Sequence, residues 1–161
     1  MRWFRFAVFV SLVTVLQASL IDTIAVTNIK PDLLLILLVF FAIYCSTTEA
    51  IITSFTIGFA ADIIIVGSAM GPRILSFGLL GTALAYLGRI ITIRKMPYQS
   101  LAIFITGFLA GAMVYLLSLL KGQPTTSGIF VSLFGTALYS SVVGPFLFLP
   151  SAWWMRIRKR V

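Results

Sequence analysis

The sequence predicts an all-α, polytopic membrane protein, a bundle of six transmembrane helices. Of its 161 residues 60% are hydrophobic and only 10% are charged, too few charges to cover a soluble globular domain. Six spans of about 20 residues each, the length that crosses a hydrocarbon core of roughly 30 Å, would use about three quarters of the chain. We therefore expect residues 1–161 to form a single integral membrane domain.

The charge balance indicates contact with a membrane surface. The formal net charge is +8, from 12 Lys and Arg against 4 Asp and Glu. The basic residues gather at the ends of the apolar runs, as the positive-inside rule and anionic headgroups produce. We therefore expect anionic lipid, and no nucleic acid, among the partners.

The chain has no histidine and a single cysteine, Cys45. These absences exclude Ser-His-Asp and Cys-His catalysis, zinc sites built on imidazole and an intramolecular disulfide. We therefore expect no catalytic residue, no metal and no cofactor.

The first three helices are expected over residues 4–21, 31–47 and 49–66. The first apolar run resembles the hydrophobic region of a signal peptide, and we interpret it as a retained helix. Pro31 suits the first position of the second helix, where Asp32 places a negative charge at the positive end of the helix dipole. Ser46-x-x-Glu49 fits a capping box that starts the third helix at about Thr47.

Asp62 falls inside the third apolar run. Ionisable groups within membrane segments are costly and mark functional sites by default, whereas the alternative is a structural Asp that satisfies backbone groups near a helix end or meets the headgroups. We expect Asp62 to accept hydrogen bonds from a basic group or a free backbone N–H, with Arg73 the first candidate and Lys30 the second. A four-residue spacing places it on a face of small residues that allows another helix to come close. That face comprises Ala50, Ser54, Gly58 and Asp62.

The last three helices are expected over residues 73–89, 98–120 and 127–149. The segment from Gly67 to Gly71 forms the turn before the first of them. That helix carries a second small face, made of Gly78, Gly81 and Ala85. Gly107-x-x-x-Gly111 on the fifth helix is a dimerisation-type motif that is also common by chance, so self-association stays open.

Aromatic and basic residues follow the sixth helix. Trp153 and Trp154 suit an interfacial anchor, and the tail after them contacts lipid and sets the topology. The basic residues of the tail are Arg156, Arg158, Lys159 and Arg160. Six crossings put both termini on one side. With cytoplasmic termini, nine of the 12 Lys and Arg lie inside and three outside, which is the bias that the positive-inside rule requires.

Three stretches resemble the family of the bacterial rod-shape-determining protein MreD. They are Lys30-Pro31-Asp32-Leu33, Phe55-x-x-Gly58-x-x-x-Asp62 and the turn from Gly67 to Gly71. The family pattern has glycine before the Phe and leucine after the central Gly, where this chain has Ser54 and Phe59. We therefore take the following residues as candidates for partner binding or helix packing: Pro31, Asp32, Phe55, Gly58, Asp62, Gly67, Gly71 and Arg73.

The resemblance implies a non-enzymatic scaffold of the cell-elongation machinery in the bacterial inner membrane. Such a scaffold binds the transmembrane and juxtamembrane segment of MreC and supports rod shape and peripheral peptidoglycan synthesis. MreC in turn links it indirectly to MreB filaments and peptidoglycan synthases. On this view the small-residue faces dock the partner's helix. The family is also similar in fold to the S components of energy-coupling-factor transporters.

Two other classes of function remain as alternatives. The first is such an S component, taking up a vitamin or a metal ion; the resemblance would predict an Ala-x-x-x-Ala face on the first helix, which has only Ala7 and Ala18. The second is an intramembrane enzyme, but an aspartyl protease needs two carboxylates that share a proton, and only Asp62 is embedded. A proton-coupled transporter that uses Asp62 alone stays open.

Overall fold

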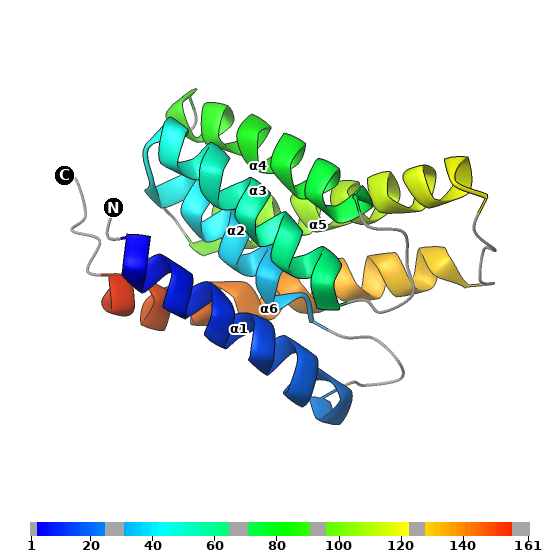
Figure 1. Ribbon diagram of the computed structural model, residues 1–161, viewed down its shortest axis with the longest axis horizontal. Helices are drawn as coiled ribbons and strands as arrows, with labels where there is room; N and C mark the ends of the chain where they lie inside the picture. The colour runs from blue at the N-terminus through cyan, green and yellow to red at the C-terminus, as the bar shows by residue number, and fades with distance from the viewer. Residues whose placement is uncertain (1–2, 25–30, 65–70, 91–95, 123–127, 156–161) are drawn as a thin grey trace.

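The computed structural model describes residues 3–24, 31–64, 71–90, 96–122 and 128–155 (Figure 1). Within these residues the chain forms helices and no strand, so the expected all-α class is confirmed. The start of α1 and the end of α6 lie at the same end of the molecule (Figure 1). The helices are α1 (Trp3–Ile24), α2 (Leu33–Tyr44), α3 (Thr47–Ile64), α4 (Pro72–Ile90), α5 (Met96–Leu120) and α6 (Ile129–Met155).

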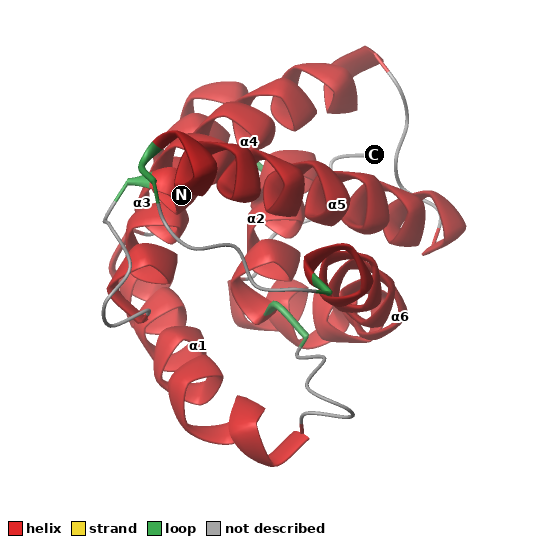
Figure 2. Cartoon of the chain, turned by 90° about the vertical axis from the view of Figure 1, so that its right-hand side faces the viewer, coloured by secondary structure: helices red, strands yellow, loops and turns green. Residues whose placement is uncertain are grey.

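Helix α2 is the centre of the bundle. It contacts each of the other five described helices, which lie around it in Figure 2. Its residues from Leu34 to Ala42 are all buried, and a helix that is apolar around its whole circumference belongs in an interior. Its 12 residues span about 18 Å, well short of a hydrocarbon layer of roughly 30 Å. Packing on every side therefore holds this helix in place.

The boundary between α2 and α3 differs from the expected helices at 31–47 and 49–66. Helix α2 ends before Cys45, whose backbone is extended at φ −95° and ψ 169° and whose N–H still bonds the carbonyl of Phe41 at 3.0 Å. Ser46 then donates from its N–H and its hydroxyl to Oε2 of Glu49, at 3.4 and 2.9 Å. The Glu49 half of the expected capping box is therefore present, since its carboxylate accepts from the N–H of Ser46, and α3 starts at Thr47 as expected.

Helices α3 and α4 pack more extensively than any other described pair. A Cβ atom added at Gly58 would lie 2.9 Å from the Cα of Ile74 and 3.0 Å from the carbonyl oxygen of Arg73. Further along the pair, the ring of Phe55 covers Gly78 and the side chain of Ser54 contacts Gly81. The two small faces thus fill each other, and the expectation that they dock a partner's helix is corrected.

Helices α5 and α6 pair through the Gly-x-x-x-Gly motif. A Cβ atom at Gly107 would lie 3.4 Å from the Cβ of Ala137, and one at Gly111 would collide with the side chain of Leu133. Both of these neighbours belong to α6 of the same chain. The motif therefore supports packing within the chain, and it carries no argument for self-association.

Helix α6 extends further than the expected 127–149, because it passes Pro145 and Pro150 and ends at Met155. Proline is tolerated in membrane helices, where the backbone groups that it frees can find other partners. The two tryptophans therefore lie in the helix, with Trp153 exposed. The basic tail, Arg156, Arg158, Lys159 and Arg160, lies outside the described residues. Helices α1, α4 and α5 match their expected ranges to within one turn.

Three described helices are long and apolar enough to cross a membrane: Thr47–Ile64, Pro97–Leu120 and Phe130–Ser151. Two shorter helices, Trp3–Ser19 and Leu33–Tyr44, are also apolar. Large apolar side chains such as Phe59, Leu79 and Ile105 are exposed on the outside of the bundle, where lipid would cover them. These features identify a helical membrane protein.

Replacing Gly58 with alanine should destabilise the α3–α4 pair. The added methyl group meets backbone atoms of Arg73 and Ile74, which cannot move aside without shifting the helix, and overpacking of this kind costs about 1–3 kcal/mol. Unfolding by sodium dodecyl sulfate in mixed micelles measures the loss. The matched control is Gly88→Ala on α4, where the nearest atom would be 3.8 Å away. Equal stability of the two variants would contradict the close crossing.

Candidate functional site

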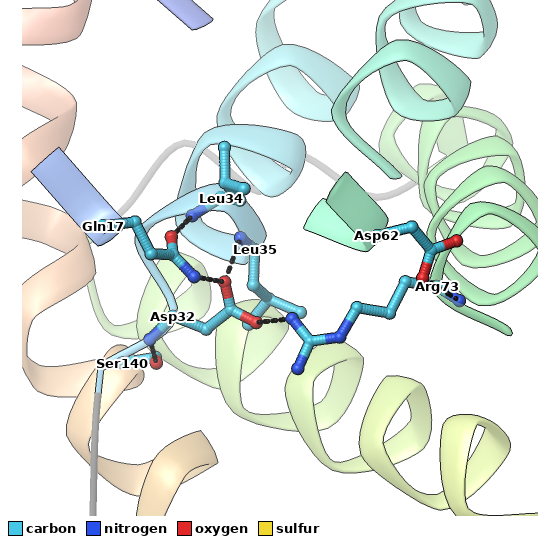
Figure 3. A network of polar contacts seen from close by, with 7 residues as sticks. All are labelled: Gln17, Asp32, Leu34, Leu35, Asp62, Arg73 and Ser140. Atoms are coloured by element: carbon cyan, nitrogen blue, oxygen red, sulfur yellow. Dashed lines mark hydrogen bonds and ion pairs between the residues drawn. The ribbon is translucent and has the colours of Figure 1, made fainter. Parts of the chain in front are cut away.

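A cluster of polar groups lies where the end of α3 meets the starts of α2 and α4 (Figure 3). At its centre is Asp62, which is 4% exposed. Its Oδ2 accepts hydrogen bonds from the backbone N–H groups of Gly71 and Ile74, at 3.0 and 3.1 Å. Its Oδ1 accepts one from the N–H of Arg73 at 3.3 Å. A carboxylate on α3 therefore caps the N-terminus of α4.

This cap accounts for all backbone donors at the start of α4. The first N–H groups of a helix have no partner within it, but Pro72, the first helical residue, has no N–H. The N–H of Leu75 bonds the carbonyl of Gly71 at 3.0 Å, and Asp62 takes the remaining three. Its negative charge also lies at the positive end of the helix dipole.

Gly71 permits the turn into this cap. Its φ is +122°, a backbone conformation that side-chain-bearing residues rarely adopt. Glycine at this position therefore lets the N–H point toward Asp62. Gly67, at the other end of the expected turn, lies outside the described residues.

The expected hydrogen bonding of Asp62 is confirmed in part. The donors are backbone N–H groups, and one belongs to Arg73. The guanidinium of Arg73 points elsewhere, because its Nη1 lies 3.8 Å from Oδ2 of Asp32 (Figure 3). Lys30, the second candidate, lies outside the described residues. Arg73 thus connects two carboxylates, one through its main chain and one through its side chain.

Asp32 is the N-cap of α2, and its Oδ1 accepts from the N–H of Leu35 at 3.1 Å. Gln17 of α1 donates to the same oxygen at 3.1 Å and accepts from the N–H of Leu34 at 2.9 Å. The N–H of Asp32 donates to the hydroxyl of Ser140 in α6 at 2.9 Å. The start of α2 is therefore tied to α1, α4 and α6 at once.

Sequence reasoning missed the roles of Gln17 and Ser140. Gln17 is an amide within an apolar run, and in hydrocarbon such a group needs a partner, so its isolation was an available signal. Ser140 is fully buried, but a serine in a membrane helix is too common to be informative. The sequence separations between Gln17, Asp32 and Ser140 do not indicate that these residues are in contact.

The remaining candidates take structural positions. Pro31 is buried beside Asp32, and Phe55 is 43% exposed with its ring against Gly78. Both oxygens of Asp62 accept from the start of α4, whereas Asp32 accepts from the start of α2 through Oδ1 and faces Arg73 with Oδ2. Within the residues described, no three His, Cys, Asp or Glu side chains are grouped to hold a metal ion. The cluster is arranged to join helices.

The fold and this cluster together define a helical membrane protein in which one buried and one half-buried carboxylate bond to helix ends. A scan against protein-family models matches the family described as rod shape-determining protein MreD over residues 1–158. The chain therefore belongs to the MreD family and has a role in determining rod shape. This is a family of shape-determining structural proteins and not a known enzyme family. Neither the curated proteins nor the solved structures that were searched include a match.

Replacing Asp62 with leucine should strongly destabilise the bundle. The substitution removes the acceptor for three backbone N–H groups, and each buried donor left without a partner costs about 1–3 kcal/mol. We therefore expect a loss of roughly 3 kcal/mol or more in unfolding free energy. Asp62→Asn retains one carbonyl oxygen and should lose less. Glu49→Gln is the matched control, since glutamine also completes a capping box. A Leu variant as stable as this control would show that the bonds of Asp62 contribute nothing.

Proposed function

We propose that this protein is a six-pass, non-enzymatic scaffold of the cell-elongation machinery in the bacterial inner membrane. It binds the transmembrane and juxtamembrane segment of MreC, and through MreC it supports peripheral peptidoglycan synthesis. Its links to peptidoglycan synthases and MreB filaments are indirect. Both termini face the cytoplasm, where the basic tail contacts anionic lipid.

The observation that carries this proposal is the family match over residues 1–158. The site supports it, because the buried polar groups of the described bundle bond to helix ends and to side chains of neighbouring helices. A molecule built in this way acts by presenting a rigid surface to another membrane segment.

The outer face of α3 is our choice for the surface that receives the MreC helix. Its small face is filled by α4, so a partner must use another side of the helix. That side carries four exposed apolar residues at helical spacing: Ile52, Phe55, Phe59 and Ile63. Phe55 is part of the stretch that resembles the family. Gly58 and Asp62 join the same helix to α4. These four residues therefore form a continuous apolar stripe, and the packing of α3 against α4 fixes the orientation of that stripe.

Cysteine cross-linking tests this proposal directly. Because Cys45 is the only cysteine, a Cys45→Ser background allows single cysteines to be placed at Phe59 or at Ile105, an exposed residue on α5. With cysteines scanned through the MreC membrane helix, Phe59→Cys should give a disulfide-linked heterodimer. Ile105→Cys, at similar exposure, should give little.

Two outcomes would contradict this arrangement. Equal cross-linking at both positions would remove the α3 stripe as the docking surface. If MreC neither cross-links nor co-purifies with the wild-type protein, the scaffold function itself fails. Inserted but loosened variants, such as Gly58→Val, should retain less MreC than wild type when normalised to the amount of protein in the membrane.

Reporter fusions test the orientation. Alkaline phosphatase, which is active only after export, should be inactive when fused after Val161, because nine of the 12 Lys and Arg then lie on the cytoplasmic side. The same enzyme fused after Gly122, between α5 and α6, should be active. The reverse pattern would show that the chain is inserted the other way up.

A further inference from the structure

A cavity of about 200 Å³ lies beside the polar cluster, between the starts of α2 and α4 and the facing sides of α5 and α6. Most of its wall is apolar or small, including Phe77, Val114 and Leu133. Its polar lining comes from Asp32, Arg73 and two hydroxyl residues of α6. Pockets for drug-sized ligands hold about 300–1,000 Å³, so this space suits a smaller group.

The guanidinium of Arg73 lines this cavity and keeps hydrogen-bond donors for a ligand, although it faces the carboxylate of Asp32. Its side chain is 26% exposed, and its contact with Asp32 is long, at 3.8 Å between Nη1 and Oδ2. Hydrogen bonds from a guanidinium normally measure about 2.7–2.9 Å. The other oxygen of Asp32 already accepts from Gln17 and Leu35. Of the five donors that a guanidinium carries, none makes a hydrogen bond within the part of the chain that the structure describes.

Two hydroxyl side chains of α6 also line the cavity. Ser132 and Thr136 are four residues apart, so they lie on one face of α6, and both line the cavity. Several buried hydroxyls of α3 and α4 bond carbonyls of their own helices, whereas these two make no hydrogen bond to any described residue. The charged lining is the ion pair of Arg73 with Asp32, and the unbonded guanidinium donors together with these two hydroxyls suit an oxyanion.

We propose that this cavity binds the phosphate group of a phospholipid. The guanidinium of Arg73 and the hydroxyls of Ser132 and Thr136 donate to the phosphate oxygens, a pairing that arginine makes with high geometric specificity. The apolar wall receives the glycerol and the first methylenes of the acyl chains. Arg73 lies in the first turn of α4, near the level of the headgroups. The lipid would bridge α4 and α6, and this inference does not depend on MreC.

The charge on Arg73 can be removed without breaking the cap of α4. Asp62 bonds the main-chain N–H of Arg73 and not its side chain, so Arg73→Gln retains that bond. Arg89→Gln is the matched control, because it removes the same charge from the other end of the same helix. Val114→Phe fills the cavity without changing charge, and Thr136→Val removes one hydroxyl at nearly constant shape.

Native mass spectrometry of the purified, delipidated full chain, titrated with phosphatidylglycerol, measures binding. We expect one phospholipid per chain, with an affinity about tenfold weaker in Arg73→Gln, equal to roughly 1.4 kcal/mol. Val114→Phe should also weaken binding, and Arg89→Gln should match wild type. The midpoint temperature of thermal unfolding should rise when phosphatidylglycerol is added, and it should not rise with inorganic phosphate at the same concentration.

Three outcomes would overturn the proposal. Lipid retention by Arg73→Gln and Val114→Phe at the wild-type level would show that the cavity is not the site. An equal loss in Arg89→Gln would reduce the effect to general surface charge. Stabilisation by inorganic phosphate that equals that of the lipid would show that a soluble anion, and not a phospholipid, is the ligand.

Discussion

The bonds from Asp62 to the first turn of α4 are the constraint on which the rest of the arrangement depends. The first N–H groups of a helix have no partner within it, and where the helix start is buried, water does not satisfy them. Asp62 supplies their acceptor from a neighbouring helix, and it can do so only if α3 and α4 approach closely. Gly58 allows that approach, and Gly71 turns the chain into it. Asp62, Gly58 and Gly71 therefore act together to hold α3 against α4.

Arg73 links this contact between α3 and α4 to α2, at the centre of the bundle. Its main chain bonds Asp62 and its side chain lies beside Asp32, which caps the short, central helix α2. Gln17 and Ser140 add α1 and α6 to the same cluster. Buried polar groups are costly unless they are satisfied, and here their partners are helix ends. These bonds fix the positions of the helices relative to one another, as the proposed scaffold function requires.

Local signals predicted a large part of the fold. The apolar runs located the helices, the Ser46 to Glu49 spacing located the start of α3, and the isolation of Asp62 indicated a buried carboxylate with backbone partners. These signals depend on neighbours in the chain. The predicted end of α2 and the predicted length of α6 were wrong. The extended backbone at Cys45 and the continuation of α6 through Pro150 depend on contacts with other helices, which the local sequence does not specify. The partner of the Arg73 side chain was also missed, since Asp32 and Asp62 are equally plausible from spacing.

By itself the sequence determined that the chain enters a membrane as helices, which orientation its basic residues favour, and which faces of those helices are small. Hydrophobicity, charge position and helical periodicity are properties of consecutive residues, so they can be read without coordinates. Only the tertiary structure decided that the small faces of α3 and α4 fill each other, that Gln17 and Ser140 reach Asp32, and that a cavity remains beside Arg73. These outcomes depend on which helices become neighbours, and the pairing follows from shape and from the need to satisfy every buried donor across the whole bundle.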